Sequence, residues 1–368
     1  MSITQRWHDL LAARQPSALQ RLSRAGLGLL ADGYALGVAA NLWVFDRALL
    51  QRQTLPCPVI SVGNLTLGGT GKTTACAFLA ERLLSRGIVP AVILRGHRRR
   101  GRGRLLVSDG ADVLAEPDES GDEAYMLTRL VPGAVVAVGK WREDAGRMVL
   151  RDTPAEAVIL DDGFQYFRMH RDLDIVLLDA LDPLTADARL FPAGTLREPL
   201  AQLRRAHLLW LTHSDLASAA ALGNLKALAA GAAPGVPWVE VIHRPTSLRP
   251  VHESGTPHPP DFLAGKRVAA LSGIGHPKAF ERTVRRLGAA HVEPTRFPDH
   301  HRYSARDGQT ILRRAQSSDL IVTTEKDAVR LPEVLRTSGK AYALGIEAEI
   351  TANADALEAA LDRALGGT

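Results

Sequence analysis

A glycine-rich segment directly before a lysine is the first feature of the sequence that could do chemistry. Residues 64–78 read NLTLGGTGKTTACAF. Glycines let a backbone approach a ligand closely, and the N–H groups of such a turn, followed by a helix N-terminus, bind phosphate oxygens. Lys72 would then reach the outer phosphates of a nucleotide, and the hydroxyl of Thr73 would bind Mg²⁺. The segment therefore predicts a nucleotide-binding loop.

The loop departs from the strict phosphate-loop pattern at one position. The pattern G-x-x-x-x-G-K-[ST] has a glycine where this chain has Thr66. The context, an apolar run of strand length before the loop and a helical stretch after it, still favours nucleotide binding over a structural turn. The guanine-selecting N-K-x-D is missing, since TEKD at 324–327 is only superficially similar, and this favours ATP. The candidate nucleotide-binding residues are Thr66, Gly68, Gly69, Thr70, Gly71, Lys72, Thr73 and Thr74.

An acidic pair follows another apolar run. Residues 157–165 read AVILDDGFQ, so Asp161 and Asp162 come directly after a candidate strand. At the carboxyl edge of a parallel sheet they would lie beside the phosphate loop, where a carboxylate holds Mg²⁺ directly or through water. The alternative is an Asp-Asp-Gly turn with a helix cap.

Transfer of a phosphoryl group to an alcohol further requires a base and positioned cations. The base is a carboxylate or imidazole near the attacking hydroxyl, and the cations surround the moving group. Each candidate also has a structural interpretation: a helix cap for Asp122, solvated loop histidines, and surface ion pairs for the arginines. The candidate acids and bases are Asp122, Glu123, Asp299, His300 and His301, and the candidate cations are Arg95, Arg142, Arg171 and Arg197.

Apolar runs of strand length alternate with helical stretches from Pro58 onward. Runs without polar alternation are typical of strands covered on both faces, which predicts an α/β protein with a mostly parallel sheet between helix layers. The last helix, ADALEAALDRAL, could pack on either domain. The expected strands lie at 58–63, 91–94, 134–138, 157–160, 174–180 and 207–212, with further strands within 267–275 and 320–331, and the expected helices lie at 72–86 and 216–235.

The composition of the chain is that of a globular protein. The chain has 368 residues, 46% hydrophobic and 23% charged, which excludes a disordered chain. Two cysteines without metal-ligand spacing indicate a reducing compartment. The net charge of +5 favours an anionic partner: a nucleotide, a nucleic acid or a phospholipid surface.

The order of apolar runs, helical stretches and a proline-rich segment predicts four parts along the chain. They are an N-terminal segment (1–50), a phosphate-loop domain (51–240), a proline-rich linker or extended ribbon (241–260) and a smaller α/β domain (261–368).

The N-terminal segment mixes arginines with a long apolar stretch. Asp32 and Asp46 interrupt that stretch, and charges inside a membrane-spanning helix are costly. No small-residue cleavage site ends a clean apolar core, which argues against a signal peptide. Two readings remain, a basic amphipathic helix on a membrane surface and an ordinary packed pair of helices.

Taken together, eight segments resemble the tetraacyldisaccharide 4′-kinase family, the lipid A 4′-kinases of Gram-negative bacteria. The resemblance runs from about residue 20 to residue 335. The segments occur in the family's order: SVGNLTLGGTGKT, GDEA, LDDGFQ, RDLDIVLLDA, FPAGTLREPL, LSGIG, FPDHH and VTTEKDAVR.

This resemblance implies a reaction and a place in the cell. ATP, with Mg²⁺, would phosphorylate the 4′-hydroxyl of a tetraacylated glucosamine disaccharide 1-phosphate at the cytoplasmic face of the inner membrane. The implied fold is a larger P-loop NTPase-like domain and a smaller C-terminal α/β domain. The N-terminal segment would be a peripheral contact with an anionic membrane surface and the acylated lipid, and no nucleic acid would bind.

The resemblance also implies roles for single residues. Asp122 resembles the catalytic base, and His300 resembles its partner. Lys72 and Thr73 would bind phosphate and Mg²⁺, with the acidic pair Asp161 and Asp162 beside them. The other positions implied are Glu123 as a further metal contact and Arg95, Arg142, Arg197 and Glu198 as contacts to the phosphates or the acceptor.

Three positions differ from the usual family segments, and two rival functions remain open. His97 stands where the family has tyrosine, Ala124 where it has proline, and Tyr166 where it has histidine. One rival is a P-loop ATPase of the partitioning or metal-chaperone class, and the other is a catalytically idle nucleotide-binding module. The ATPase does not account for the basic N-terminus or for FPDHH, and the retention of Lys72, Asp122, Asp161 and His300 argues against the idle module.

Overall fold

The computed structural model describes residues 7, 10–11, 17–97, 99–182, 184, 188–252 and 255–366. The chain divides into two compact units, each made of separate stretches of sequence. The first unit consists of Met1–Lys72, Ala157–Val241 and Ile350–Thr368, and the second consists of Thr73–Glu156 and Ile242–Glu349. Arg6 and Arg14, two of the predicted N-terminal basic residues, lie outside the described residues.

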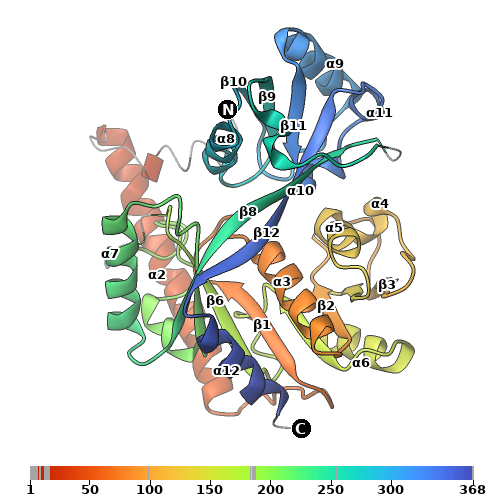
Figure 1. The fold of residues 1–368 in the computed structure, drawn as a ribbon. Helices are drawn as coiled ribbons and strands as arrows, with labels where there is room; N and C mark the ends of the chain where they lie inside the picture. Colours follow the sequence, from red (N-terminus) through yellow and green to blue (C-terminus); the bar gives the residue numbers. More distant parts are fainter. Residues whose placement is uncertain are drawn as a thin grey trace. The chain divides into compact units, whose positions relative to one another are not determined.

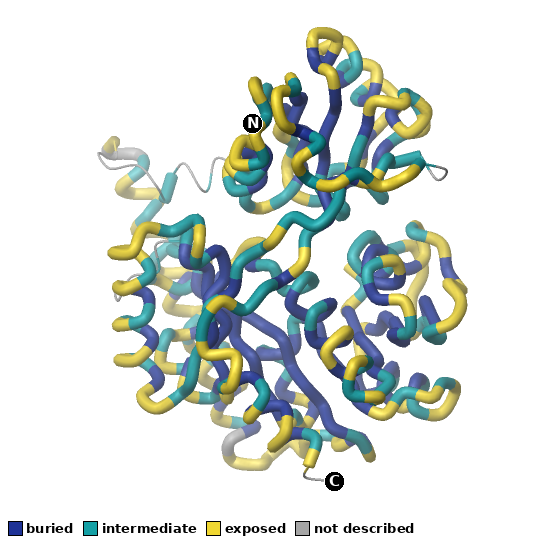
Figure 2. The backbone as a smooth tube through the Cα atoms, in the orientation of Figure 1, coloured by how far each residue is buried: buried dark blue, intermediate teal, exposed yellow. Residues whose placement is uncertain are grey.

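Four parallel strands form the centre of the first unit. They are ordered β7 (Leu208–Thr212), β6 (Leu173–Asp179), β1 (Val59–Asn64) and β5 (Ala157–Asp161). All their residues are buried, and the tube in Figure 2 is dark blue along β1 and β6, which Figure 1 labels. The prediction of doubly covered parallel strands from continuous apolar runs is confirmed here. Because β1 and β5 are parallel neighbours, the segments that follow them leave the sheet at the same edge.

Helices of the first unit pack on these strands. Helix α7 (Ala219–Ala232) contributes Leu225 and Ala229 to a core cluster that also contains Val176 and Leu209 from β6 and β7. Helix α12 (Ala354–Leu365) contacts β6 and β7, so the last helix belongs to this unit. Helix α2 (Ala18–Asp46) continues through its four glycines, and its Leu42 and Phe45 pack on Phe167. The short 3-10 helix η1 spans Leu200–Arg205.

The described residues in the first part of the second unit form three strands and four helices. Strand β2 (Pro90–Leu94) pairs in parallel with β4 (Val135–Val138), and β3 (Leu105–Asp109) pairs with β4 antiparallel. Strand β3 was not predicted, since LLVSD is short and half polar. The helices are α3 (Lys72–Ser85), which begins at the last residue of the first unit, α4 (Pro117–Ser120), α5 (Asp122–Leu130) and α6 (Arg142–Asp152).

The later part of the second unit is a parallel sheet with helices on both faces. Val268 and Ala270 of β9 pack with α8, while Ala269 and Leu271 pack with α9 and α11, as the two-residue period of a strand requires. The strands are ordered β10 (His291–Arg296), β9 (Arg267–Ser272), β11 (Leu320–Thr324) and β12 (Ala341–Ala352). The helices are η2 (Pro260–Leu263), α8 (Pro277–Arg286), α9 (Ala305–Arg314), η3 (Ala315–Ser317), α10 (Glu325–Ala328) and α11 (Glu333–Arg336).

The segment expected as a linker or ribbon is a ribbon over its first half. Strand β8 spans Trp238–Pro250, so residues 241–250 are extended strand. Strands β8 and β12 each begin in one unit and end in the other. The α/β class with mostly parallel strands is confirmed, whereas the boundaries at 50, 240 and 260 stay a prediction.

Glu325 is a half-buried acid at the start of α10, and it makes the stability of the protein depend on pH. Burial raises the pKa of Glu325 from 4.5 to about 7, although the N–H of Ile346 donates to its carboxylate at 3.4 Å. The folded state therefore holds this proton more tightly than the unfolded state. The stability that this difference provides is complete below pH 4.5 and is lost as pH rises through 7.

We expect Glu325→Gln to remove this pH dependence. Relative to wild type, the variant should gain up to about 3 kcal/mol of unfolding free energy between pH 5 and pH 8. Urea denaturation at both pH values measures the gain. Glu333→Gln, on the exposed first turn of α11, is the matched control and should show no such gain. Equal changes in the two variants would contradict the prediction.

Candidate active site

The glycine-rich loop connects the carboxyl end of β1 to the start of α3, as the sequence predicts. Strand β1 ends at Asn64, and α3 begins at Lys72. Gly68 and Gly71 have φ values of +129° and +83°, which side-chain-bearing residues rarely adopt. These two glycines therefore permit the turn that leads from β1 into α3.

Lys72 lies in a cluster of polar side chains in the first unit. Its Nζ lies 3.1 Å from Oδ1 of Asn64 and 3.6 Å from Oδ1 of Asp162. The guanidinium of Arg197 binds both carboxylate oxygens of Asp162, at 2.6 and 3.0 Å. The structure thus brings three predicted residues together. Asn64, whose Oδ1 also accepts from Arg197 at 3.3 Å, was not predicted as a site residue.

The acidic pair occupies a tightly packed turn after β5. Asp161 is buried at the end of the strand, and Asp162 has a φ of +55°, in the left-handed region. A Cβ at Gly163 would lie 2.8 Å from Oγ of Ser61 and 2.8 Å from Cβ of Leu160. Glycine is therefore required there, and the packing fixes a strained backbone conformation of the kind that concentrates at functional sites.

Arg197 is positioned by backbone pairing with the loop. Its N–H donates to the carbonyl of Leu65 at 2.7 Å, and the N–H of Leu67 donates to the carbonyl of Thr195 at 2.8 Å. The hydroxyl of Tyr34, on α2, donates to the carbonyl of Arg197 at 3.0 Å. Strand-like contacts thus hold the FPAGTLREPL segment against the phosphate loop.

Glu198 follows Arg197 and is paired with a different arginine, Arg205. Its buried carboxylate accepts a hydrogen bond from Arg205, whose guanidinium stacks on Phe164 and Phe167 at 4.2 and 4.6 Å. Burial raises the pKa of Glu198, and the charge of Arg205 opposes that shift. This contact supports a role for Glu198 in holding the segment in place, and Arg205 was not predicted as a site residue.

A second cluster forms around Asp122 in the second unit. Asp122 is the first residue of α5, after Gly121 with a φ of +85°. Its Oδ2 lies 3.9 Å from Nδ1 of His300 and 3.4 Å from Nε of Arg330. His300 has a φ of +57°, a second left-handed residue at a predicted site position. The predicted pair is therefore assembled, with Arg330 as a partner that the sequence did not predict.

Lys326 completes this cluster. Its Nζ lies 3.1 Å from Glu123, 3.3 Å from Asp299 and 3.2 Å from Nε2 of His300. Glu123 was expected as a metal contact, but its carboxylate is paired with an ammonium ion, and we leave it out of the proposed metal site.

A buried aspartate holds Arg330 in place. Asp327 accepts from Arg330 at 2.5 Å, from the hydroxyls of Thr324 and Tyr303 at 2.8 and 3.1 Å, and from the N–H of Gly273 at 2.9 Å. Desolvation and the charge of Asp327 raise the pKa of Tyr303, which therefore remains a hydrogen-bond donor. The network aims Arg330 at Asp122.

These neighbours determine the charge of Asp122. Burial alone would raise the pKa of Asp122, but the nearby His300 ring and the positive charges of Arg330 and Lys326 hold this pKa below its ordinary value. Asp122 is consequently an ionised carboxylate near neutral pH, as a proton acceptor must be.

Comparisons with known proteins identify the family. The family model described as tetraacyldisaccharide-1-P 4′-kinase matches residues 24–366. The chain belongs to the tetraacyldisaccharide-1-P 4′-kinase family. A tetraacyldisaccharide 4′-kinase from Anaeromyxobacter dehalogenans (strain 2CP-C) is 41% identical over 353 residues, which are 94% of this chain and 92% of that protein. One from Geobacter sulfurreducens is 37% identical over 366 residues, 99% and 100% of the two chains.

A solved structure agrees with this membership of the tetraacyldisaccharide-1-P 4′-kinase family. The crystal structure of LpxK from Aquifex aeolicus in complex with ATP superposes with a TM-score of 0.74 at 29% identity. The match covers 93% of this chain and 99% of that chain. The recognition from eight sequence segments is confirmed.

Two of the three departures from the usual family segments now have a structural setting. The ring of His97 meets the ring of His300 edge to face, with centroids 6.0 Å apart. Ala124 is buried in the first turns of α5, where a proline would also fit the helix start. At the third departure, the carbonyl of Tyr166 accepts a hydrogen bond from Arg171 at 2.7 Å.

Two of the other predicted cations contact groups other than Lys72, Asp162 and Asp122 in this 4′-kinase-family chain. Buried Arg142 donates to the carbonyls of Gly139 and Lys140, both at 3.3 Å. Arg171 forms a buried ion pair with Asp174 at 2.7 Å. Arg95 is exposed directly after β2. The roles of Arg95 and Arg142 at the phosphates or the acceptor stay a prediction, and the ion pair of Arg171 with Asp174 is a structural contact. The remaining loop histidine, His301, lies 3.2 Å from a carboxylate oxygen of Asp307.

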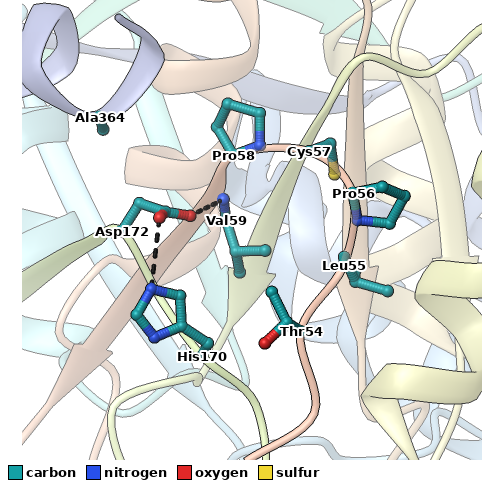
Figure 3. A pocket seen from close by; sticks show the side chains of 9 residues that line it. All are labelled: Thr54, Leu55, Pro56, Cys57, Pro58, Val59, His170, Asp172 and Ala364. Carbon is teal, nitrogen blue, oxygen red and sulfur yellow. Dashed lines mark hydrogen bonds and ion pairs between the residues drawn. The ribbon is translucent and has the colours of Figure 1, made fainter. Parts of the chain in front are cut away.

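One cavity of about 410 Å³ lies at the opposite end of β1 (Figure 3). Its lining includes Val59, whose N–H donates to Asp172 at 2.7 Å, and His170, which lies 3.4 Å from the same carboxylate. Burial raises the pKa of Cys57 in this lining to about 11, so its thiol is protonated at neutral pH. Ligands of parallel sheets bind at the carboxyl ends of the strands, and this cavity is at the amino end.

Within the described part of the chain, no group of three or more His, Cys, Asp or Glu side chains is arranged to hold a metal ion. The candidate magnesium ligands Thr73, Asp161 and Asp162 supply one hydroxyl and two carboxylates, which are the hard oxygen donors that Mg²⁺ prefers. The chemistry of this donor set fits magnesium bound with nucleotide phosphates and water.

Proposed function

We propose that this protein transfers the γ-phosphoryl group of ATP to the 4′-hydroxyl of a tetraacylated disaccharide 1-phosphate in lipid A biosynthesis. The observation that carries the proposal is the family match over residues 24–366. The relatives named as tetraacyldisaccharide 4′-kinases are matched over nearly their whole length, and the Aquifex aeolicus relative is described as a complex with ATP. A P-loop NTPase-like larger domain and a smaller C-terminal α/β domain are part of this proposal.

The loop cluster would bind the nucleotide. Lys72 and the loop amides would contact the phosphates, as their place before α3 supports. Magnesium, when bound, would neutralise negative charge on the outer phosphates. Thr73 and Asp161 would be its ligands. Asp162 is already bound through both oxygens to Arg197 and is the weaker candidate.

The Asp122 cluster would activate the acceptor. The ionised carboxylate of Asp122 takes the proton of the 4′-hydroxyl while the hydroxyl oxygen attacks the γ-phosphorus and ADP leaves. His300 and Arg330 hold the carboxylate in position. The new bond from the hydroxyl oxygen to the γ-phosphorus replaces the bond from phosphorus to ADP. The proton of the hydroxyl ends on Asp122.

Helix α2 would place the protein on a membrane. Among the described helices it is long and apolar enough to cross a bilayer by length and composition, with a stretch of mean hydropathy 1.3 that is 11% buried. Leu22, Leu29, Leu36 and Trp43, spaced seven residues apart, are all exposed. They form a stripe about 32 Å long at 1.5 Å per residue. We propose that this stripe lies in the interface of the anionic cytoplasmic leaflet of the inner membrane.

A triple substitution tests the membrane proposal. We expect Leu22→Ser/Leu29→Ser/Leu36→Ser to weaken binding to anionic phospholipid vesicles by at least about tenfold, since each leucine loses roughly 2 kcal/mol of apolar burial. Vesicle co-sedimentation measures binding. Substituting the exposed Ala25, Ala39 and Ala40 of α2 by serine is the control. Unchanged binding of the leucine variant would contradict this role of α2.

Labelled ATP tests the reaction directly. Purified protein with [γ-³²P]ATP, Mg²⁺ and the acylated disaccharide in detergent micelles should transfer label to the lipid. Label found only in free phosphate, with the lipid present, would instead support a P-loop ATPase.

A further inference from the structure

Lys326 has three hydrogen-bond donors and three acceptors within reach. An ammonium group carries three N–H bonds and no acceptor. Its Nζ lies 3.1 Å from Oε1 of Glu123, 3.3 Å from Oδ1 of Asp299 and 3.2 Å from Nε2 of His300. Each donor therefore has one acceptor, provided that Nε2 carries no proton. A proton on Nε2 would place two donors against each other.

We propose that Lys326 is a positioning residue that fixes His300 as the neutral tautomer with its proton on Nδ1, facing Asp122. Only the catalytic consequence rests on the proposed function, because the tautomer follows from the hydrogen bonds alone.

The charge of Lys326 supports this assignment. Burial alone would lower the pKa of Lys326, but the carboxylates of Glu123 and Asp299 outweigh that effect and raise it. The group is therefore an ammonium ion at neutral pH and does not accept a proton from Nε2.

The shortest contact between a charged group and the His300 ring is the one to Lys326. Its Nζ lies 3.2 Å from Nε2, whereas carboxylate oxygens of Asp299, Glu123 and Asp122 lie 3.9 to 4.0 Å from the ring nitrogens. The groups that face His300 are Asp122 and Glu123 from α5, Asp299 from its own loop, Lys326 and Arg330 from α10 and the residues after it, and His97 from the loop after β2.

The tautomer has a consequence for the reaction. With Nε2 occupied, His300 presents only an N–H to Asp122, so it orients the carboxylate and does not compete for the substrate's proton. The distance of 3.9 Å from Nδ1 to Oδ2 is longer than a hydrogen bond, and such contacts often shorten only when substrate binds. Lys326 thus acts on Asp122 through His300.

Nitrogen-15 NMR of ring-labelled histidine tests the proposal without any catalytic readout. In metal-free full-length protein at pH 7.5, the His300 signals, assigned by their absence in His300→Gln, should show a protonated Nδ1 and an unprotonated Nε2. Lys326→Met should abolish this pattern, giving either the opposite tautomer or a doubly protonated ring. Lys340→Met, at an exposed position, should leave it unchanged.

Kinetics supply a second, separate readout. We expect Lys326→Met to lower kcat for lipid phosphorylation roughly tenfold with little change in KM, and Lys326→Arg to recover part of the loss together with the Nδ1–H signal. An unchanged tautomer in Lys326→Met would overturn the inference. An inactive wild-type protein with the expected tautomer would overturn the proposed function and leave the inference standing.

Discussion

Asp122→Ala is expected to lower the rate of lipid phosphorylation at least about a hundredfold, the contribution of a positioned general base. Arg330 and His300 hold this carboxylate ionised and in a fixed orientation. Asp122→Asn should lose a similar amount, because an amide of the same shape does not accept the hydroxyl proton. Initial rates of label transfer to the lipid measure both variants.

Two controls separate chemistry from folding. Asp118→Asn removes a carboxylate four residues earlier, on α4, that is 63% exposed and pairs with Arg100 at the surface. It should retain wild-type activity. The thermal midpoint of Asp122→Asn should remain within a few degrees of wild type, since the Arg330–Asp327 contact persists. Full activity in Asp122→Ala would remove Asp122 from the role of base.

The loop and most strands of both units could be predicted because their signals are local. A glycine turn before a lysine, or a run of valine and leucine, specifies its structure within ten residues. Strands β12 and β10 were not predicted. The sequence of β12, AYALGIEAEITA, mixes small and polar residues, and β10 contains Pro294. Their pairing is decided by neighbouring strands and not by their own sequence.

The partners of the site residues could not be predicted, because they come from distant parts of the chain. Asp122 meets Arg330 across more than 200 residues, and Lys72 shares Asp162 with Arg197. VTTEKDAVR was recognised as a family segment without roles for its charges. Only the fold shows that its lysine and arginine contact the predicted acid–histidine pair, and that Arg142 and Arg171 are engaged elsewhere.

Lys72→Ala is expected to have an effect of the same size, at least about a hundredfold, for a different reason. The ammonium group would stabilise charge that develops on the transferred phosphoryl group, and loss of such a group costs two to three orders of magnitude in kcat. Its exposed fraction of 19% and its contact with Asp162 at 3.6 Å place it at the surface of the loop cluster. The loss should therefore fall mainly on kcat, measured with saturating ATP and lipid.

The structure also predicts that this variant folds. Without Lys72, Asp162 keeps both of its bonds to Arg197, so no buried carboxylate is left without a cation. Lys140→Ala removes a lysine of the second unit that lies over the ring of Trp141, and it should retain activity. If the Lys72→Ala variant had the thermal midpoint of the wild type and also phosphorylated lipid at the wild-type rate, the loop would not be the phosphate site. Loss of activity with an intact fold would attribute the effect to the charge of Lys72 alone.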